Sequence, residues 1–432
     1  MSQQARPNVL IFVPHDLGRH VGCYGVETVH TPRIDALAAE GARFANCFCT
    51  APQCSPSRAS LFTGRYPHSN GVMGLTHADF AWYLHPTERH LASVLREAGY
   101  HTACTGHPHE ARSREMLGMD EMLPGGRAWN VSHVVSEFLE DRRGQTQPFF
   151  LEVCTIEPHR LPHGFGAYPD ISKGVTIPPF IYPELSAEED FADFQGAIRL
   201  LDEHIGRILD TLERTGQTEN TLVVMTADHG MPFPRAKCSL YDPGLQVPLI
   251  LRQPGAGWRP GAVFPELISN IDVMPTLLEY LGLGVPEAVQ GRSFLGLLQG
   301  RGYEPRDRIF GEMTYHDYCD PRRCVRTAGH KLIVNFTAAP FFMNPSQTYR
   351  PKCVTRTPEE PAYAYHPPVE LYDLTADPWE EVNLAGDEAY AAIRSELLAS
   401  LHEWMIRTGD PLLDGIPDSP MHRMAMAALQ GG

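Results

Sequence analysis

The chain has 432 residues and an acidic balance, with 36 basic against 52 acidic side chains and a net charge of −16. This balance argues against a protein that binds nucleic acid through a broad basic face, although a local basic pocket for an anion remains compatible with it. The length predicts one large domain and a smaller one. The first apolar run, residues 9–13, is too short for a signal peptide or a membrane span, so we expect a cytoplasmic chain with no membrane partner.

Strand-like and helix-like segments alternate along the first two-thirds of the chain. Residues 32–40 are predicted to be a helix, because Thr31 is a suitable N-cap, Pro32 a suitable first residue and Gly41 a stop signal. Residues 186–215 have the spacing of a long amphipathic helix. The segments predicted to be buried strands are "NVLIFV", "HTACTG", "PFFLEVCT", "NTLVVMT" and "VPLILR". This alternation predicts an α/β fold with a mostly parallel mixed sheet sandwiched by helices.

The character of the sequence changes after residue 318. "RTAGHKLIVNF" and "VELYDL" read as antiparallel strands, "YAAIRSELLASLHEWMIRTG" as a closing helix, and residues 340–368 as a Pro-rich excursion. We therefore predict a larger catalytic domain over residues 1–318. The prediction for residues 319–432 is a smaller α+β subdomain with an antiparallel sheet.

Acidic and histidine side chains follow the ends of several predicted strands. His15 and Asp16 follow the first, and Asp228 and His229 follow a later one. In open α/β sheets, ligands bind at the carboxyl ends of the strands. Two carboxylates and two imidazoles converging there predict a site for a divalent cation, although any one of them alone is equally well explained as a cap or a rim residue.

Positively charged and histidine side chains near the same strand ends suggest a pocket for a tetrahedral anion, which needs several cationic or N–H donors around it. The candidates for this pocket are Arg58, His107, His109, His159, Arg160 and Lys237.

Cys54 lies in "APQCSPSRASLFTGR", just before a helix predicted to begin near Pro56. The ten cysteines include no CxxC pair, so most are expected to be free core thiols. A helix N-terminus favours an anion and activates a thiolate, and Arg58 can lie on the same side. From the residues alone, Cys54 is a core thiol, a thiolate nucleophile or a modified residue.

The segment "CSPSRASLFTGR" resembles the C-x-P-S-R signature of type I sulfatases, in the alkaline-phosphatase-like superfamily. Further matches fall in the family's order over nearly the whole chain: "RPNVLIFVPHDLGRHVGCYG", "TPRIDALAAEGARFANCF", "LREAGYHTACTG", "TADHG", "DVMPTLLEYLG" and "ELYDLTADPWEEVNLA". A closer resemblance is to the heparan N-sulfatase (sulfamidase) branch, through "GVMGL", "PFFLEVCTIEPHR", "MPFPRAKCSLYDPG" and His316 in "GEMTYHDY".

The resemblance implies a sulfatase acting on a sulfate ester or sulfamate, with a sulfated sugar as one candidate substrate. A maturation enzyme would oxidise Cys54 to Cα-formylglycine, whose hydrated diol is the nucleophile and a metal ligand. A covalent sulfate ester at residue 54 would then collapse, because the second hydroxyl of the diol expels sulfate. Arg58 would steady the diol, and His109 would assist the collapse. The remaining implied roles are metal binding for Asp16, Asp228 and His229, contact with sulfate and leaving group for His159 and Lys237, and substrate binding for His107, Arg160 and His316.

Two positions depart from the family pattern. His15 stands where most members have aspartate, which moves the preferred metal from calcium toward manganese or zinc if His15 is a ligand. His107 stands where most members have lysine, which makes the pocket less reliably cationic at neutral pH.

Other functions stay open at this stage. A phosphonate monoester or phosphodiester hydrolase would use the same formylglycine site, whereas a non-catalytic binder of sulfated glycans would need neither metal nor modification. A homo-oligomer is also compatible with the sequence.

Overall fold

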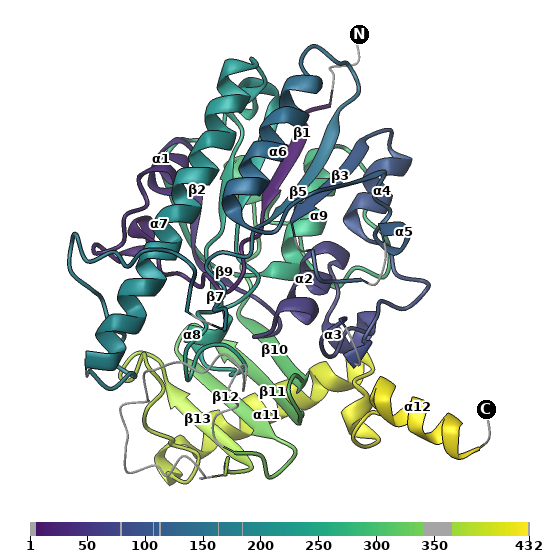
Figure 1. Cartoon of the computed structure of the whole chain (residues 1–432). Helices are drawn as coiled ribbons and strands as arrows, with labels where there is room; N and C mark the ends of the chain where they lie inside the picture. The colour runs from purple at the N-terminus through teal and green to yellow at the C-terminus, as the bar shows by residue number, and fades with distance from the viewer. Residues whose placement is uncertain are drawn as a thin grey trace.

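A computed structural model describes residues 6–77, 80–106, 108–111, 114–162, 164–183, 185–340 and 365–430 of the chain. It contains a nine-stranded sheet covered by helices and, below it in Figure 1, a four-stranded sheet flanked by a long helix. The predicted fold class is therefore confirmed: a mixed, mostly parallel α/β sheet and a C-terminal antiparallel sheet.

The large sheet has the strand order β4-β3-β5-β1-β6-β8-β2-β7, with β9 paired to β2. The run from β4 to β6 is parallel, whereas β8 pairs antiparallel to both β6 and β2. The strands are β1 (Asn8–Phe12), β2 (Ala42–Phe48), β3 (His101–Gly106), β4 (Glu121–Leu123), β5 (Phe149–Cys154), β6 (Thr221–Met225), β7 (Gln246–Val247), β8 (Ile250–Arg252) and β9 (Ala262–Ser269).

Helices cover both faces of this sheet, with α6 and α7 toward the viewer in Figure 1 and α2 and α9 behind it. The predicted helices at residues 32–40 and 186–215 are present as α1 and α7. The helices of this part are α1 (Pro32–Glu40), α2 (Cys54–Thr63), α3 (Pro67–Asn70), α4 (Leu91–Glu97), α5 (Arg114–Leu117), α6 (Ala128–Asp141), α7 (Leu185–Arg214), α8 (Asp242–Leu245), α9 (Val273–Tyr280) and α10 (Leu295–Leu298).

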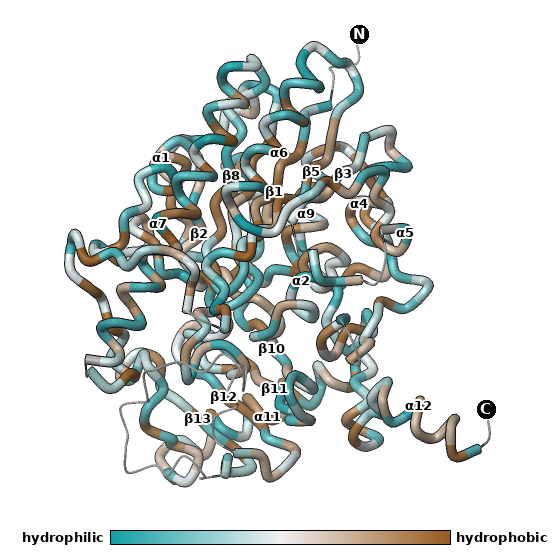
Figure 2. Tube along the Cα trace, viewed as in Figure 1, coloured by the Kyte–Doolittle hydropathy of each residue, from teal (hydrophilic) through white to brown (hydrophobic). Residues whose placement is uncertain are grey.

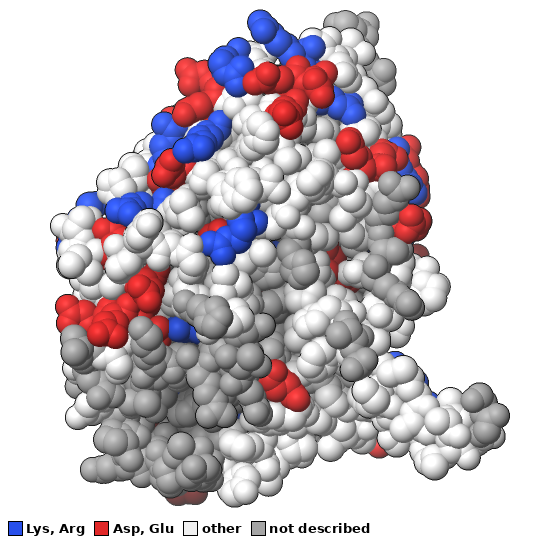
Figure 3. Space-filling view, in the orientation of Figure 1, with Lys and Arg blue, Asp and Glu red and all other residues white. Residues whose placement is uncertain are grey.

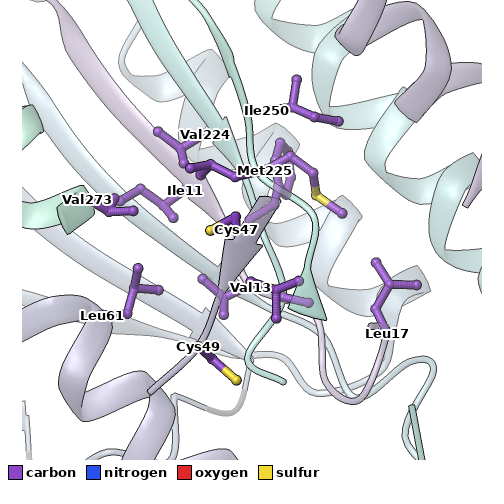
Figure 4. Packing of buried hydrophobic residues seen from close by; sticks show 14 of the residues in the cluster. Ile11, Val13, Leu17, Cys47, Cys49, Leu61, Val224, Met225, Ile250 and Val273 are labelled. Atoms are coloured by element: carbon purple, nitrogen blue, oxygen red, sulfur yellow. The ribbon is translucent and has the colours of Figure 1, made fainter. Parts of the chain in front are cut away.

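The core lies on the two faces of the central strands. Every residue of β1 is buried, as expected for a parallel strand with helices on both sides, and Figure 2 shows the central strands as brown, hydrophobic tube. In Figure 4, Leu61 of α2 and Val273 of α9 lie beside Ile11 of β1. Cys47 belongs to the same packed cluster, which agrees with the expectation that most cysteines are core thiols.

The second sheet has the order β10-β11-β12-β13 and is antiparallel throughout. The predicted boundary at residue 318 falls between β10 and β11, which pair with each other. Trp404 of the closing helix stacks on Phe310 and anchors that helix to the sheet. The elements are β10 (Arg308–Tyr315), β11 (Cys319–Thr327), β12 (His330–Asn335), β13 (Val369–Asp373), α11 (Ala391–Thr408) and α12 (Pro420–Leu429).

The second sheet also holds a loop of the first part of the chain. Lys331 of β12 donates to the backbone oxygen of Leu240 at 3.0 Å and forms ion pairs with Asp242 and Glu380. Glu370 of β13 accepts a hydrogen bond from the Tyr241 hydroxyl at 2.7 Å. The segment that carries the predicted site residue Lys237 is thus held by hydrogen bonds and ion pairs from β12 and β13 of the second sheet.

Among the described residues, no helix combines the length and apolar character that crossing a membrane requires. On the face drawn in Figure 3, acidic and basic side chains are interspersed, and the residues described there form no continuous basic patch.

Candidate active site

The loops that follow β1 and β6 meet because these strands are neighbours in the parallel sheet. Their pairing continues past the last strand residues: the Thr226 amide donates to Phe12, and the Gly18 amide donates to His229. Asp16 adopts a left-handed backbone, with φ 55°, and its amide donates to the Asp228 carboxylate at 2.9 Å. The sequence-predicted residues of the two strand ends are therefore brought together.

Asp16 is the centre of the buried cluster. Lys237 Nζ donates to both Asp16 carboxylate oxygens at 3.0 Å, and His229 Nε2 lies 3.1 Å from Oδ1. Burial by itself would raise the pKa of Asp16, but the neighbouring His159, Lys237 and His229 side chains lower it far below its ordinary value. Burial likewise opposes the charge of Lys237, and the Asp16 carboxylate outweighs that effect and raises the lysine pKa. Asp16 is therefore a fixed carboxylate at the floor of the site.

Asp228 carries the second negative charge and is shared by two cationic groups. Arg58 Nη2 donates to its Oδ2 at 3.1 Å, and His15 Nδ1 lies 3.1 Å from the same oxygen. Burial would raise the pKa of Asp228, but His229 and Arg58 lower it to about 2. Burial and Arg58 would lower the pKa of His15, whereas Asp228 raises it to about 9. Arg58 and His15 thus both face the same oxygen of Asp228.

Cys54 is the first residue of α2, slightly earlier than the helix start predicted near Pro56. Its thiol lies 3.3 Å from His229 Nε2 and 4.0 Å from an Asp16 carboxylate oxygen. Burial would raise the pKa of Cys54, but the charges of Lys237 and His229 hold it well below its ordinary value. A side chain at this position lies at a helix N-terminus and near Lys237 and His229, which together favour an anionic or oxyanionic group.

The donor set fits a divalent cation. Ligand atoms of His15, Asp16, Cys54 and Asp228 all lie within 4.8 Å of one another and are buried. The His229 Nδ1–H donates to the backbone oxygen of Gly230 at 2.9 Å, which leaves the lone pair of neutral His229 on Nε2, the nitrogen that faces Asp16. A cation bound among these atoms would take the place of the protons that now balance the two carboxylates.

His109 faces the same cluster from the loop after β3. It is held in a left-handed backbone conformation, with φ 62°, and Cys54 is among the groups that act on its pKa. Burial lowers its pKa to about 4, so the ring is neutral at physiological pH. Its Nε2 lies 2.5 Å from Nδ1 of His77, a residue that the sequence interpretation missed because nothing in the local pattern around it signals a site.

His159 also contacts the cluster. Its Nδ1–H donates to the backbone oxygen of Arg160, so the Nε2 lone pair points inward, 3.4 Å from Lys237 Nζ and 3.7 Å from Asp16. This geometry places a hydrogen-bond acceptor beside the cation, in agreement with the predicted proximity of His159 and Lys237.

Arg160 and His316, two of the predicted substrate-binding residues, contact acidic side chains next to the site. Arg160 forms a two-point ion pair with Asp190 of α7, at 2.7 and 3.0 Å, and its guanidinium stacks on the ring of Phe165. The Arg160 side chain therefore contacts residues packed around α7 and not the buried cluster around Asp16. His316 is buried beside Asp317, with Nδ1 3.4 Å from the carboxylate, and His107 lies outside the described residues.

Comparison with known proteins identifies the class. Residues 7–283 match the Sulfatase family, and residues 232–344 match the C-terminal domain of N-sulphoglucosamine sulphohydrolase. The chain belongs to the sulfatase family, and its relatives are named sulfatases and sulphohydrolases, which supports sulfuric ester hydrolase activity.

Individual relatives span nearly the whole chain. An ulvan-active sulfatase of Formosa agariphila is 30% identical, covering 95% of this chain and 83% of its own. Human N-sulphoglucosamine sulphohydrolase is 29% identical, covering 94% and 92%. A solved 2-O GAG sulfatase is similar in fold, with a TM-score of 0.73, 22% identity and coverage of 97% and 96%.

Proposed function

We propose that the protein is a metal-dependent sulfatase that hydrolyses a sulfate ester or sulfamate through a formylglycine hydrate derived from Cys54. The observation that carries the proposal is the surroundings of Cys54. Its thiol begins α2 within 3.3 Å of His229 and close to Asp16, inside a buried cluster that also contains Lys237. A plain core thiol has no need of such neighbours, whereas a nucleophile for an anionic ester needs both a metal site and nearby cations.

We assign the metal to Asp16, Asp228 and His229, with His15 as a further ligand. When bound, a divalent cation would supply Lewis acidity to the sulfate oxygens and lower the pKa of the attacking hydroxyl. The inward lone pair of His229 and the closeness of His15 to Asp228 support this set. A mixed nitrogen and oxygen set favours manganese or zinc over the calcium typical of all-oxygen sites.

The cationic and neutral side chains have distinct proposed tasks. Arg58 and Lys237 carry fixed positive charge and would stabilise charge on the sulfate as it transfers. Neutral His109, beside residue 54, is suited to accept a proton from it. His159 would lie near the leaving group through its inward Nε2.

The proposed substrate is a sulfated saccharide. The C-terminal match to N-sulphoglucosamine sulphohydrolase and the relation to a human enzyme of that name favour an amino sugar that carries N-sulfate. One protein of similar fold was solved with its substrate D-glucosamine-2-N,6-O-disulfate, so a sulfate on oxygen is the comparison to make.

The first experiment tests residue 54 directly. Protein produced together with a formylglycine-generating enzyme should contain a residue 54 about 18 Da lighter than cysteine by peptide mass spectrometry. The Cys54→Ala variant should lose sulfatase activity by at least about 10³-fold while its melting temperature stays close to that of the wild type. Cys47→Ala, which removes a buried thiol elsewhere in the core, is the matched control. Full activity in Cys54→Ala would refute the proposal.

A second experiment separates the substrate classes. Rates on a glucosamine N-sulfate, an aryl sulfate and an aryl phosphonate should rank in that order. The phosphonate is included because a phosphonate monoester hydrolase from Silicibacter pomeroyi has a similar fold, with a TM-score of 0.69. A higher kcat/KM on the phosphonate would replace the sulfatase proposal by the phosphonate alternative. Binding of a sulfated glycan without turnover or metal dependence would indicate the non-catalytic alternative.

A further inference from the structure

Glu152 is a carboxyl group in the interior of the large sheet. It lies in β5, between β1 and β3, where the register sets it opposite Ile11 and Cys104, and its side chain is 0% exposed. Removing a carboxyl group from water is unfavourable unless the group is paired or protonated. A hydrophobic side chain would be more favourable in this buried strand. The contacts of Glu152 therefore need to explain why a carboxyl group is present there.

Those contacts lead to the active site in two steps. The Cys154 thiol donates to Glu152 Oε1 at 3.0 Å, and Arg58 Nη1 donates to the sulfur of Cys154 at 3.1 Å. Nη2 of the same guanidinium donates to Asp228 Oδ2 and to the backbone oxygen of Val13. The orientation of the Arg58 plane is therefore set from one side by the cluster and from the other by Cys154.

A second buried carboxyl lies beside Glu152. Glu110, also 0% exposed, has a ligand atom within 4.8 Å of Glu152 and immediately follows His109 in the chain. Burial raises the pKa of both carboxyls well above the ordinary value. Burial therefore disfavours the charged forms of this pair, and Glu152 Oε1 accepts the hydrogen bond from the Cys154 thiol.

His90 stands next to this pair, and together the three residues have the composition of a metal site. The backbone amide of Ala92 donates to His90 Nδ1 at 3.1 Å, so the proton of the neutral ring is on Nε2. Nε2 faces Glu110 at 3.7 Å. A nitrogen that carries a proton has no lone pair for a metal, so His90 in this tautomer is not suited to bind one.

We propose that Cys154 and Glu152 are positioning residues that hold the Arg58 guanidinium in the plane required to contact the transferring sulfate. The inference rests on the proposed sulfatase function and adds two residues from the strand behind the site. Position 154 requires a side-chain atom that both accepts and donates a hydrogen bond, because it lies between the Arg58 guanidinium and a Glu152 carboxyl oxygen. Glu152 needs only an acceptor oxygen.

The test compares variants that keep or remove these capacities, in the full-length protein with a confirmed formylglycine. Cys154→Ala and Glu152→Leu should each lower kcat about 10- to 100-fold on a sulfate substrate, with KM within about threefold, because a misplaced catalytic group costs rate of this order. Cys154→Ser and Glu152→Gln should stay within about threefold of the wild-type kcat, because a hydroxyl and an amide oxygen preserve the contacts. Cys47→Ala is the control for lost thiol volume.

The double variant Cys154→Ala/Glu152→Leu gives the decisive reading. If both residues act through the single path to Arg58, its kcat should equal that of Cys154→Ala alone, because residues in one network are not additive. Effects that multiply would overturn the proposal, as would wild-type kcat in Cys154→Ala or equal losses in Glu152→Gln and Glu152→Leu. If the wild-type protein itself hydrolyses no sulfate, the proposed function has failed and not the positioning role.

Discussion

Replacing Glu370 by glutamine tests how firmly the second sheet holds the Lys237 segment. Glu370 accepts four hydrogen bonds, two on each carboxylate oxygen. The donors are Tyr241 and Tyr372, at 2.7 and 2.6 Å, and Asn335 and His366, at 2.7 and 3.0 Å. Tyr241 belongs to the segment after Lys237, so the substitution loosens a contact between β13 and that segment.

The size of the effect follows from the pKa of Glu370. Burial by itself would raise it, but the hydrogen bond and charge of His366 outweigh burial and lower it from 4.5 to about 2. At about 1.4 kcal/mol for each pKa unit, the ionised carboxylate contributes about 3 kcal/mol to the free energy of unfolding at pH 7. A depressed pKa means that this contribution is fully present above pH 4.5 and is lost as the pH falls toward 2. At pH 3.5 about 2 kcal/mol should remain.

The assay is urea-induced unfolding of wild type and Glu370→Gln at pH 7 and pH 3.5, with the exposed acid Glu381 replaced by glutamine as the control. We expect the difference in the free energy of unfolding between wild type and Glu370→Gln to be about 3 kcal/mol at pH 7 and about 2 kcal/mol at pH 3.5. The control should stay within about 0.5 kcal/mol of the wild type at both pH values. A difference in unfolding free energy below about 1 kcal/mol at pH 7, or a difference that increases on acidification, would refute the reasoning.

Three further predictions concern the active site. Lys237→Met should lower kcat by about 10²- to 10³-fold with the fold intact by circular dichroism, because it removes a buried cation beside Asp16, and an unchanged kcat would exclude its electrostatic role. Dialysis against a chelator should abolish activity, and one of calcium, manganese or zinc should restore it. Asp16→Asn should lower the metal content of the protein as measured by mass spectrometry. Activity without metal would contradict the assigned ligand set. His77→Ala should lower kcat about tenfold while His77→Asn, which keeps a group near the position of Nδ1, restores most of it, and equal activity of the two variants would exclude a hydrogen-bonding role toward His109.

Local patterns were sufficient for the elements and for part of the site. The cap and stop signals around residues 32–40 predicted α1 correctly, and the alternation of strands and helices predicted the parallel sheet. Because carboxyl ends of adjacent parallel strands meet at one edge, the placement of Asp16 and Asp228 near each other also followed from strand order.

Other features depend on contacts between segments far apart in the chain. Arg160 has the same charge as Lys237 and lies in an equally suggestive motif, yet Asp190 of α7 pairs with it, and no local pattern predicts that partner. His77 is next to His109 because two loops meet. The helix α12 was not among the elements predicted from the sequence.

The sequence by itself determined the class of fold, the identity of the nucleophile candidate and the kinds of donor around it, because helix caps, strand periodicity and the C-x-P-S-R signature are all local. Only the tertiary structure decided which charges neutralise each other, since ion pairs and pKa values depend on distances of a few ångströms between remote residues. Glu152 illustrates the difference: in the sequence it interrupts an apolar strand, whereas in the fold it is two hydrogen bonds from Arg58.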